Sequence, residues 1–466
     1  MNNKRKNLAV KFIDMALIFI LSLSTVAMFI GYSVIKNTTS YSALPEFDFR
    51  TSGEIFLESD NEFYSKSELE LISPCFVGFA GKRNITPVLP AARHQFLAEA
   101  KPFLLSVFSD ISTLIEFSSE DAKQTYIREN IYEKDSYLYF EFENELPASA
   151  IYPAISGKAL ETVYHAFGVK KLFVFCENGS VSGIALDACG NVATLANRNT
   201  TALNFDTLSS YNETYGMGSF EFIKHEDQYF AVIRESVSRP DLVAYNSNGE
   251  FLVQNSDDAS NILGAFGFNP NGTRFFTSED SITYVEDKGD LIISSTGDIL
   301  YTETDGGISI SVVSGTKKES YSFEDKIVAA HDILGGLDKQ IFGGYADLSL
   351  SYVSYDSEDM SLCLDFEYTA NGVRIYNETP AARLIIKQNN LVYASVNAKS
   401  YSAAETSHTD IPQKLLFVFS SNDFEKESVP QSFVPIYTAT QENVYSAKYA
   451  FIYKEELPTE KEVEKE

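Results

Sequence analysis

The stretch Lys171-Leu-Phe-Val-Phe-Cys-Glu-Asn-Gly-Ser-Val-Ser-Gly-Ile-Ala-Leu186 indicates the fold class. Its two apolar runs flank Glu177-Asn-Gly179, and Asn-Gly between such runs is a strong signal for a β-hairpin. A second turn at Cys189-Gly-Asn191 leads into a third run, Val192–Leu195. A helix-like stretch at 157–167 precedes them, so the predicted order is a helix followed by antiparallel strands.

The same order recurs twice further along the chain. Ser256 precedes a helix pattern at 257–263, and Ser322 precedes another at 323–334 that we expect to end at Gly335-Gly336. This recurrence predicts an α+β fold of tandem helix-plus-antiparallel-sheet modules, not a parallel βαβ sheet. The predicted strands are 281–286, 290–294, 298–302, 346–355, 361–368, 373–376, 382–388, 391–398, 414–419, 434–437 and 447–453.

The region before the first hairpin contains one amphipathic pattern and one aromatic strand. Apolar residues recur at helical spacing across 91–117, and Pro102 is expected to split that pattern into two short helices because proline removes a backbone donor. The aromatic run 136–143 is a strand signal that stops at 144–147.

The run Met15–Ile35 contains no charged side chain and predicts a transmembrane helix. At about 1.5 Å of rise per residue it is long enough to cross a bilayer. Lys4, Arg5, Lys6 and Lys11 precede it, and the positive-inside rule places that end in the cytoplasm. The alternative is a cleaved signal peptide, which has a shorter apolar core of about 7–15 residues and small residues at its exit.

The predicted organisation is therefore a single-pass cell-membrane protein with a large extracellular part. The chain carries a formal net charge of -28, so its surface repels nucleic acid and anionic lipid, and neither is expected as a partner. The predicted segments are a cytoplasmic basic tail (1–14), the transmembrane anchor (15–35), a linker (36–66), an N-terminal ectodomain region of helices and hairpins (67–250), a middle α+β module (251–320), a C-terminal α+β module (321–453) and a disordered acidic tail (454–466).

No motif in the sequence predicts catalysis, a metal site or a cofactor. The five histidines are far apart, and His-x3-His, GxSxG and phosphate-loop patterns are absent. Ser314-Gly-Thr-Lys317 has the spacing of penicillin-binding enzymes, but no K-T-G follows, which favours coincidence. Acidic pairs at 120–121, 257–258 and 324–325 follow serines at predicted helix starts and are interpreted as capping. The histidines are His94, His165, His225, His331 and His408.

Four cysteines are too few for a disulfide-stapled scaffold and lack the spacing of a zinc site. Cys176 and Cys189 could bridge neighbouring strands, although two buried thiols explain them equally well. The other two are Cys75 and Cys363.

Three stretches resemble the membrane-anchored YycH and YycI proteins of Gram-positive bacteria, with YycH the better match in layout. They are the aromatic strand 136–147, Leu263-Gly-Ala-Phe-Gly-Phe-Asn-Pro270 leading into 284–293, and Phe366-Glu-Tyr-Thr-Ala-Asn-Gly-Val-Arg-Ile375. That family regulates the YycG (WalK) sensor kinase from outside the cytoplasm. The strongly acidic ectodomain and the charged tail after Tyr453 depart from the family pattern.

The resemblance implies a non-enzymatic regulator of a two-component sensor kinase that controls cell-wall metabolism. Its implied partners are the sensor histidine kinase and a second membrane-anchored regulator, contacted through the transmembrane helix. Ser24, Ala27 and Gly31, spaced three and four apart, place small residues on one face of that helix, where small side chains allow close helix contact. The alternative function is a tethered cell-envelope binding module or hydrolase.

Overall fold

The computed structural model describes residues 71–109, 112–160, 167–196, 203–210, 216–225, 228–246, 256–313, 318, 320–341, 345–357, 360–409, 411–420, 430 and 432–452. The predicted anchor, its Ser24, Ala27 and Gly31 face, the linker and the acidic tail lie outside these residues. Within the described ranges, no helix has the length and apolar character needed to cross a membrane.

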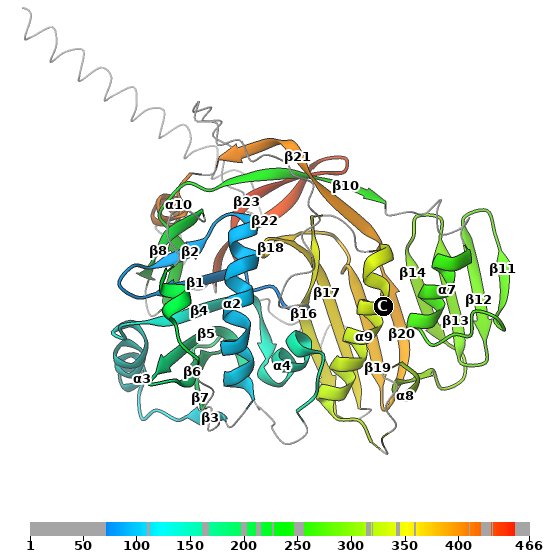
Figure 1. The fold of residues 1–466 in the computed structure, drawn as a ribbon, viewed down its shortest axis with the longest axis horizontal. Helices are drawn as coiled ribbons and strands as arrows, with labels where there is room; N and C mark the ends of the chain where they lie inside the picture. Colours follow the sequence, from blue (N-terminus) through cyan, green and yellow to red (C-terminus); the bar gives the residue numbers. More distant parts are fainter. Residues whose placement is uncertain are drawn as a thin grey trace, which may run out of the picture.

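The N-terminal half forms a nine-stranded sheet with the order β3-β7-β6-β5-β4-β1-β2-β8-β9 (Figure 1). The predicted hairpin at 171–186 is confirmed as β5 and β6, which pair antiparallel from Lys171–Leu186 to Glu177–Ser180. The strands are β1 (Phe76–Ala80), β2 (Ile85–Pro87), β3 (Ser112–Ile115), β4 (Tyr137–Pro147), β5 (Gly168–Glu177), β6 (Ser180–Leu186), β7 (Val192–Ala196), β8 (Met217–His225) and β9 (Gln228–Ile233).

Helix α2 (Pro90–Phe108) crosses one face of this sheet as a single helix, so the predicted break at Pro102 is wrong (Figure 1). Pro102 is exposed, whereas Phe96, Phe103 and Phe108 are buried beneath the helix. Burying such side chains stabilises by about 1.5–3 kcal/mol each, enough to offset the hydrogen bond that proline removes. The helix predicted to continue to residue 117 ends at Phe108, and residues 112–115 form strand β3 instead.

The first part of the helix expected at 157–167 is not helical, because α4 (Ala148–Ser156) ends where that prediction begins. Gly157 adopts a left-handed conformation with φ 62° and closes the helix, as glycine commonly does. Residues 161–166 lie outside the described part of the chain. The remaining helical elements of this half are α3 (Glu120–Ile127), the π-helical turn η1 (Arg128–Tyr132) and α5 (Asp206–Ser210).

The C-terminal half forms a fourteen-stranded sheet with the order β11-β12-β13-β14-β20-β19-β17-β18-β22-β23-β10-β21, in which β15 pairs with β20 and β16 with β17. One contact, β18 with β22, is parallel. The strands are β10 (Ser238–Asn246), β11 (Arg274–Thr277), β12 (Ser281–Glu286), β13 (Gly289–Ser294), β14 (Ile299–Glu303), β15 (Ile308–Ser309), β16 (Asp347–Asp356), β17 (Ser361–Ala370), β18 (Val373–Ile375), β19 (Ala382–Lys387), β20 (Asn390–Val396), β21 (Lys399–Thr409), β22 (Ser432–Gln441) and β23 (Val444–Ile452).

Helix α9 (Phe323–Ile341) runs past Gly335-Gly336, so the predicted stop there is wrong. A Cβ added to Gly336 would lie 2.9 Å from the Cβ of Ala265 in α7 (Ser256–Ala265). Gly336 therefore allows two helices to approach closely. The predicted Ser322 cap is confirmed, since its Oγ accepts a hydrogen bond from Asp325 N at 3.2 Å.

Residues 414–419 form a helix, α10 (Gln413–Ser420), and not the predicted strand. An unbroken apolar run does not distinguish a strand from a short helix by periodicity. The carbonyl of Pro412 accepts hydrogen bonds from the amides of Leu415 and Leu416, which starts the helix. Among the described residues of this half, the remaining helix is α8 (Ile310–Val313).

The nine-stranded sheet with α2–α5 is called the N-terminal lobe below, and the fourteen-stranded sheet with α7–α10 the C-terminal lobe. The mixed α+β class with antiparallel sheets is confirmed. The segment boundaries at 250 and 320 stay predictions. Pairing of β14 with β20 and of β10 with β21 joins strands of the three predicted ectodomain regions in one sheet.

Candidate functional site

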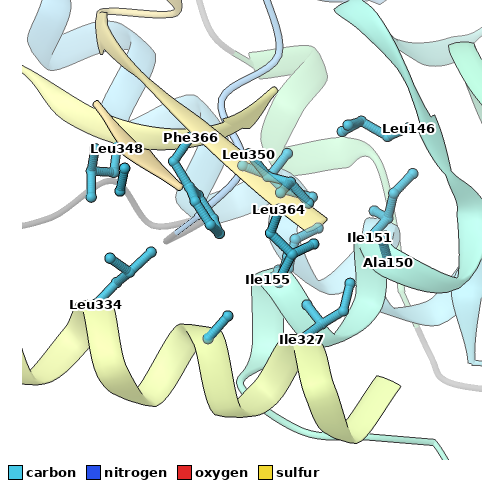
Figure 2. Close-up of a cluster of buried hydrophobic side chains, with 14 of the residues drawn as sticks. Leu146, Ala150, Ile151, Ile155, Ile327, Leu334, Leu348, Leu350, Leu364 and Phe366 are labelled. Atoms are coloured by element: carbon cyan, nitrogen blue, oxygen red, sulfur yellow. The ribbon is translucent and has the colours of Figure 1, made fainter. Parts of the chain in front are cut away.

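The two lobes meet along a continuous apolar layer between α4, α9, β16 and β17. Figure 2 shows Ile151 and Ile155 of α4 in one buried cluster with Ile327 of α9 and Leu364 of β17. All four side chains are at most 1% exposed. At about 1.5–3 kcal/mol for each side chain removed from water, this layer is strong enough to hold the lobes together.

The first described residues of the chain add backbone contacts between the lobes. Leu71 N donates to the Ala154 carbonyl at 3.3 Å, and the Leu71 carbonyl accepts from Leu350 N at 2.8 Å. Ser73 N donates to Ser349 Oγ at 2.9 Å. The segment before β1 therefore lies between α4 of one lobe and β16 of the other.

A buried ion triad crosses the junction beside this segment. The guanidinium of Arg374 on β18 contacts Glu143 of β4 at 2.9 Å and Glu367 of β17 at 3.0 Å. The Arg374, Glu143 and Glu367 side chains are 23%, 14% and 8% exposed, so water screens the triad weakly. One arginine thus faces two carboxylates, each carried by a different lobe.

The triad shifts the protonation of its members. Burial raises the pKa of Glu367 to about 7; Arg374 opposes this shift, and the nearby carboxylates of Glu143 and Asp365 add to it. Burial acts to lower the pKa of Arg374, but the two carboxylates outweigh it and the pKa rises. Glu367 Oε2 and Arg374 Nε are buried without a hydrogen-bond partner. The triad is therefore incompletely satisfied, which is costly in a region of low dielectric.

Further buried charges lie next to the triad in the N-terminal lobe. Lys170 is 2% exposed and donates to the Glu143 carbonyl, and burial lowers its pKa. Glu141 accepts a hydrogen bond from the Tyr139 hydroxyl at 2.6 Å, and its carbonyl accepts one from Cys75 Sγ at 3.2 Å. Burial also raises the pKa of the Cys75 thiol, so the thiol stays neutral and is a poor nucleophile.

A cleft of about 60 Å³ opens on the same junction. Its walls come from β1, β2 and the start of α2 in the N-terminal lobe, from the connection between β9 and β10, and from the β17–β18 turn and β22 in the C-terminal lobe. Its polar lining includes Arg93, Thr86, Gln413 and Asn371. Clefts between lobes are common places for ligands, which makes this the best candidate site in the described part of the chain.

The described histidines that the sequence analysis considered lie on separate elements. His94, His225 and His331 lie on α2, β8 and α9, and no metal-binding group of His, Cys, Asp and Glu occurs among the described residues. His165, the side chain of His408, and Ser314 and Lys317 lie outside the description. Cys176 and Cys189 are thiols, and Cys176 donates to the Leu203 carbonyl at 3.0 Å.

The capping interpretation of the acidic pairs is confirmed at two positions. Ser119 Oγ accepts from Ala122 N at 3.2 Å, with Glu120 and Asp121 in the first turn of α3. At α9, Ser322 N in turn donates to Asp325 Oδ2 at 3.0 Å, which completes a reciprocal cap. The side chains of 257 and 258 lie outside the description.

The fold is similar to a solved structure. The crystal structure of YycH from Bacillus subtilis superposes with a TM-score of 0.51 over 85% of this chain and 98% of that one, at 9% sequence identity. The chain has a YycH-like fold. The Bacillus megaterium YpeB C-terminal domain matches with a TM-score of 0.27 over 43% of this chain and 87% of that one, at 14% identity. No protein-family model and no curated protein sequence matches the chain.

Proposed function

We propose that the chain is a non-enzymatic regulator of a YycG-type sensor kinase that controls cell-wall metabolism. The YycH-like fold over 85% of the chain carries this proposal. The sequence resemblance to YycH and YycI, which regulate that kinase, points the same way. Deleting the gene should change the output of kinase-dependent promoters, and restoring the full chain should reverse the change. Unchanged output in the deletion strain would contradict the proposal.

The proposed arrangement has residues 15–35 in the membrane, the N-terminus in the cytoplasm and the two lobes outside. The charge-free apolar run and the basic residues before it support this topology. Protease added to intact, wall-stripped cells should therefore digest most of the chain. Full protection from protease would exclude the topology.

The proposed contact with the kinase, and with a second anchored regulator, runs through the transmembrane helix. The predicted cytoplasmic tail is short, which leaves contact between helices as the physical route across the bilayer. Ser24, Ala27 and Gly31 lie within about 60° of one another at 100° per residue, so their face could pack closely against another helix.

The double substitution Ala27→Leu and Gly31→Leu tests this face. Leucine keeps the segment apolar but adds bulk, so we expect normal membrane levels with weaker co-purification of the kinase and altered promoter output. The matched control is Ser22→Leu with Ser33→Leu, because these serines lie on the opposite face. Equal effects of the two variants would assign the loss to the helix in general and not to this face.

A tethered cell-envelope binding module is the second candidate, and the cleft at the junction favours it. Under that function the deletion would leave kinase-dependent promoter output unchanged.

A further inference from the structure

The guanidinium of Arg93 on α2 is buried at the cleft without a counter-charge in contact. Arg93 as a whole residue is 7% exposed. Nη2 donates to the Pro74 carbonyl at 2.5 Å and lies 3.4 Å from Ser73 Oγ. Among the described residues, no carboxylate lies within the 4.0 Å of an ion pair with Arg93; Asp347 acts on it from further away.

Two of the three guanidinium nitrogens of Arg93 have no hydrogen-bond partner among the described residues. Neither Nε nor Nη1 has a hydrogen-bond partner among the described residues, and neither is among the atoms buried away from solvent without a partner. Both nitrogens therefore keep some accessible surface, and Arg93 is one of the residues that line the cleft. Burial lowers the pKa of Arg93 to about 10, still well above neutral, so the group is charged. An anion in the cleft would offset part of the free-energy cost of burying the charged Arg93 guanidinium.

The backbone holds the guanidinium in a fixed position. Gly372, at φ 76° in the β17–β18 turn, has no side chain, and a Cβ added there would come within 2.2 Å of Arg93 Nη2. The guanidinium therefore packs over the turn of the C-terminal lobe while its own helix belongs to the N-terminal lobe. Such a preorganised donor loses little entropy when it binds.

The start of α2 adds a second feature that favours an anion. Leu89 and Pro90 at this helix end line the cleft. The first turn has no acidic residue, and the N-cap Leu89 makes no side-chain hydrogen bond to it. The positive end of the helix dipole thus has no acidic side chain in the first turn of the helix, and it lies in the wall of the cleft that Arg93 also lines.

Three other polar side chains in the walls already have hydrogen-bond partners. Gln413 accepts from Ile233 N at 2.9 Å and donates to the Phe433 carbonyl at 2.8 Å. Thr86 Oγ1 donates to the Val77 carbonyl at 2.5 Å. The guanidinium of Arg239 donates to the Tyr449 hydroxyl at 3.2 Å and stacks over its ring. The rest of the lining is largely apolar, from Val88, Leu89, Ile233, Val237, Val373 and several prolines.

We propose that this cleft binds the carboxylate of a small monocarboxylic acid, with Arg93 as its ion-pair partner. The apolar walls suit a short alkyl body, and about 60 Å³ accommodates a carboxylate with one or two carbons. A single negative charge fits better than a phosphate dianion, because the chain as a whole is strongly acidic and repels multivalent anions. The bound acid would touch both lobes and so link their relative position to its concentration. The proposal goes beyond kinase regulation, and its test needs no kinase.

The test titrates carboxyl-labelled propionate into the purified full chain and follows the carboxyl carbon by NMR. Propionamide, which has nearly the same shape and no charge, is the matched probe, and inorganic phosphate is the third. We expect saturable propionate binding, at least tenfold weaker propionamide binding and weaker phosphate binding. Loss of a charge-assisted hydrogen bond is large enough for this ratio.

Arg93→Gln should weaken propionate binding at least tenfold, and Arg93→Lys should retain part of it. The matched control is Arg128→Gln, because Arg128 has a side chain that is 55% exposed and lies on η1, outside the cleft. Equal binding of propionate and propionamide to the unaltered chain would overturn the proposal without any variant. Unchanged propionate affinity in a folded Arg93→Gln protein would overturn it as well.

Discussion

Replacing Glu367 by glutamine should remove a large pH dependence of stability. The folded-state pKa of Glu367 is about 7, above the ordinary value of 4.5, because burial and neighbouring carboxylates disfavour its charge. A raised pKa means that the folded state binds a proton that the unfolded chain has released. The stabilisation is therefore complete below about pH 4.5 and is lost as the pH rises through about 7.

The size of this effect follows from the two pKa values. Each pH unit between the two pKa values corresponds to about 1.4 kcal/mol, which gives about 3.4 kcal/mol in total and about 2.5 kcal/mol between pH 5 and pH 8. The Glu367 side chain is 8% exposed, so screening by solvent reduces the figure little. Glutamine keeps the shape and the acceptor for Arg374 but has no titrating proton.

Urea unfolding at pH 5 and pH 8 measures the difference. The chain has no tryptophan and 27 tyrosines, so tyrosine fluorescence and far-ultraviolet circular dichroism are suitable probes. We expect the unaltered protein to lose about 2.5 kcal/mol more than Glu367→Gln over this range. Glu442→Gln, at an exposed turn, is the control and should behave like the unaltered chain. If Glu367→Gln also follows the unaltered pH profile, the triad does not hold a proton on Glu367.

Two further predictions concern the helices of the C-terminal lobe. Gly336→Val should destabilise the chain by about 1–3 kcal/mol because the valine side chain would collide with Ala265. Gly335→Ala should be neutral or stabilising, because a Cβ at that position meets nothing within 4 Å. Thermal unfolding of the two variants measures the difference. Ser322→Ala should lower the free energy of unfolding by about 1 kcal/mol through loss of the α9 cap, and increased amide exchange in the first turn of α9 would show that the loss is local.

Local turn chemistry made much of the fold predictable. Strand β12 begins and ends where the alternation at 281–286 predicted it, and the turns at Asn178-Gly179 and Asn371-Gly372 adopt the positive φ angles that Asn-Gly allows. Strands β10 and β21 were missed. β21 is rich in serine, threonine and alanine, and its pairing with β10 connects residues more than 150 positions apart. Such pairing depends on tertiary contacts that no local pattern encodes.

The sequence analysis did not predict the ion triad, because apolar and charged residues alternate along β17. Leu364, Phe366 and Tyr368 are apolar and buried, which makes the intervening Asp365 and Glu367 look like a solvent-facing row. In the fold Asp365 and Glu367 are 7% and 6% exposed as whole residues, and the arginines of β19 and β18 bind their carboxylates. Period-two alternation indicates that the two faces of a strand differ in polarity. It does not indicate that the polar face is exposed to solvent. A charged residue on such a buried face needs a partner on a neighbouring strand, as Arg374 of β18 provides for Glu367. Where an oxygen stays without a partner, as Glu367 Oε2 does, protonation is the remaining way to reduce the cost of burial.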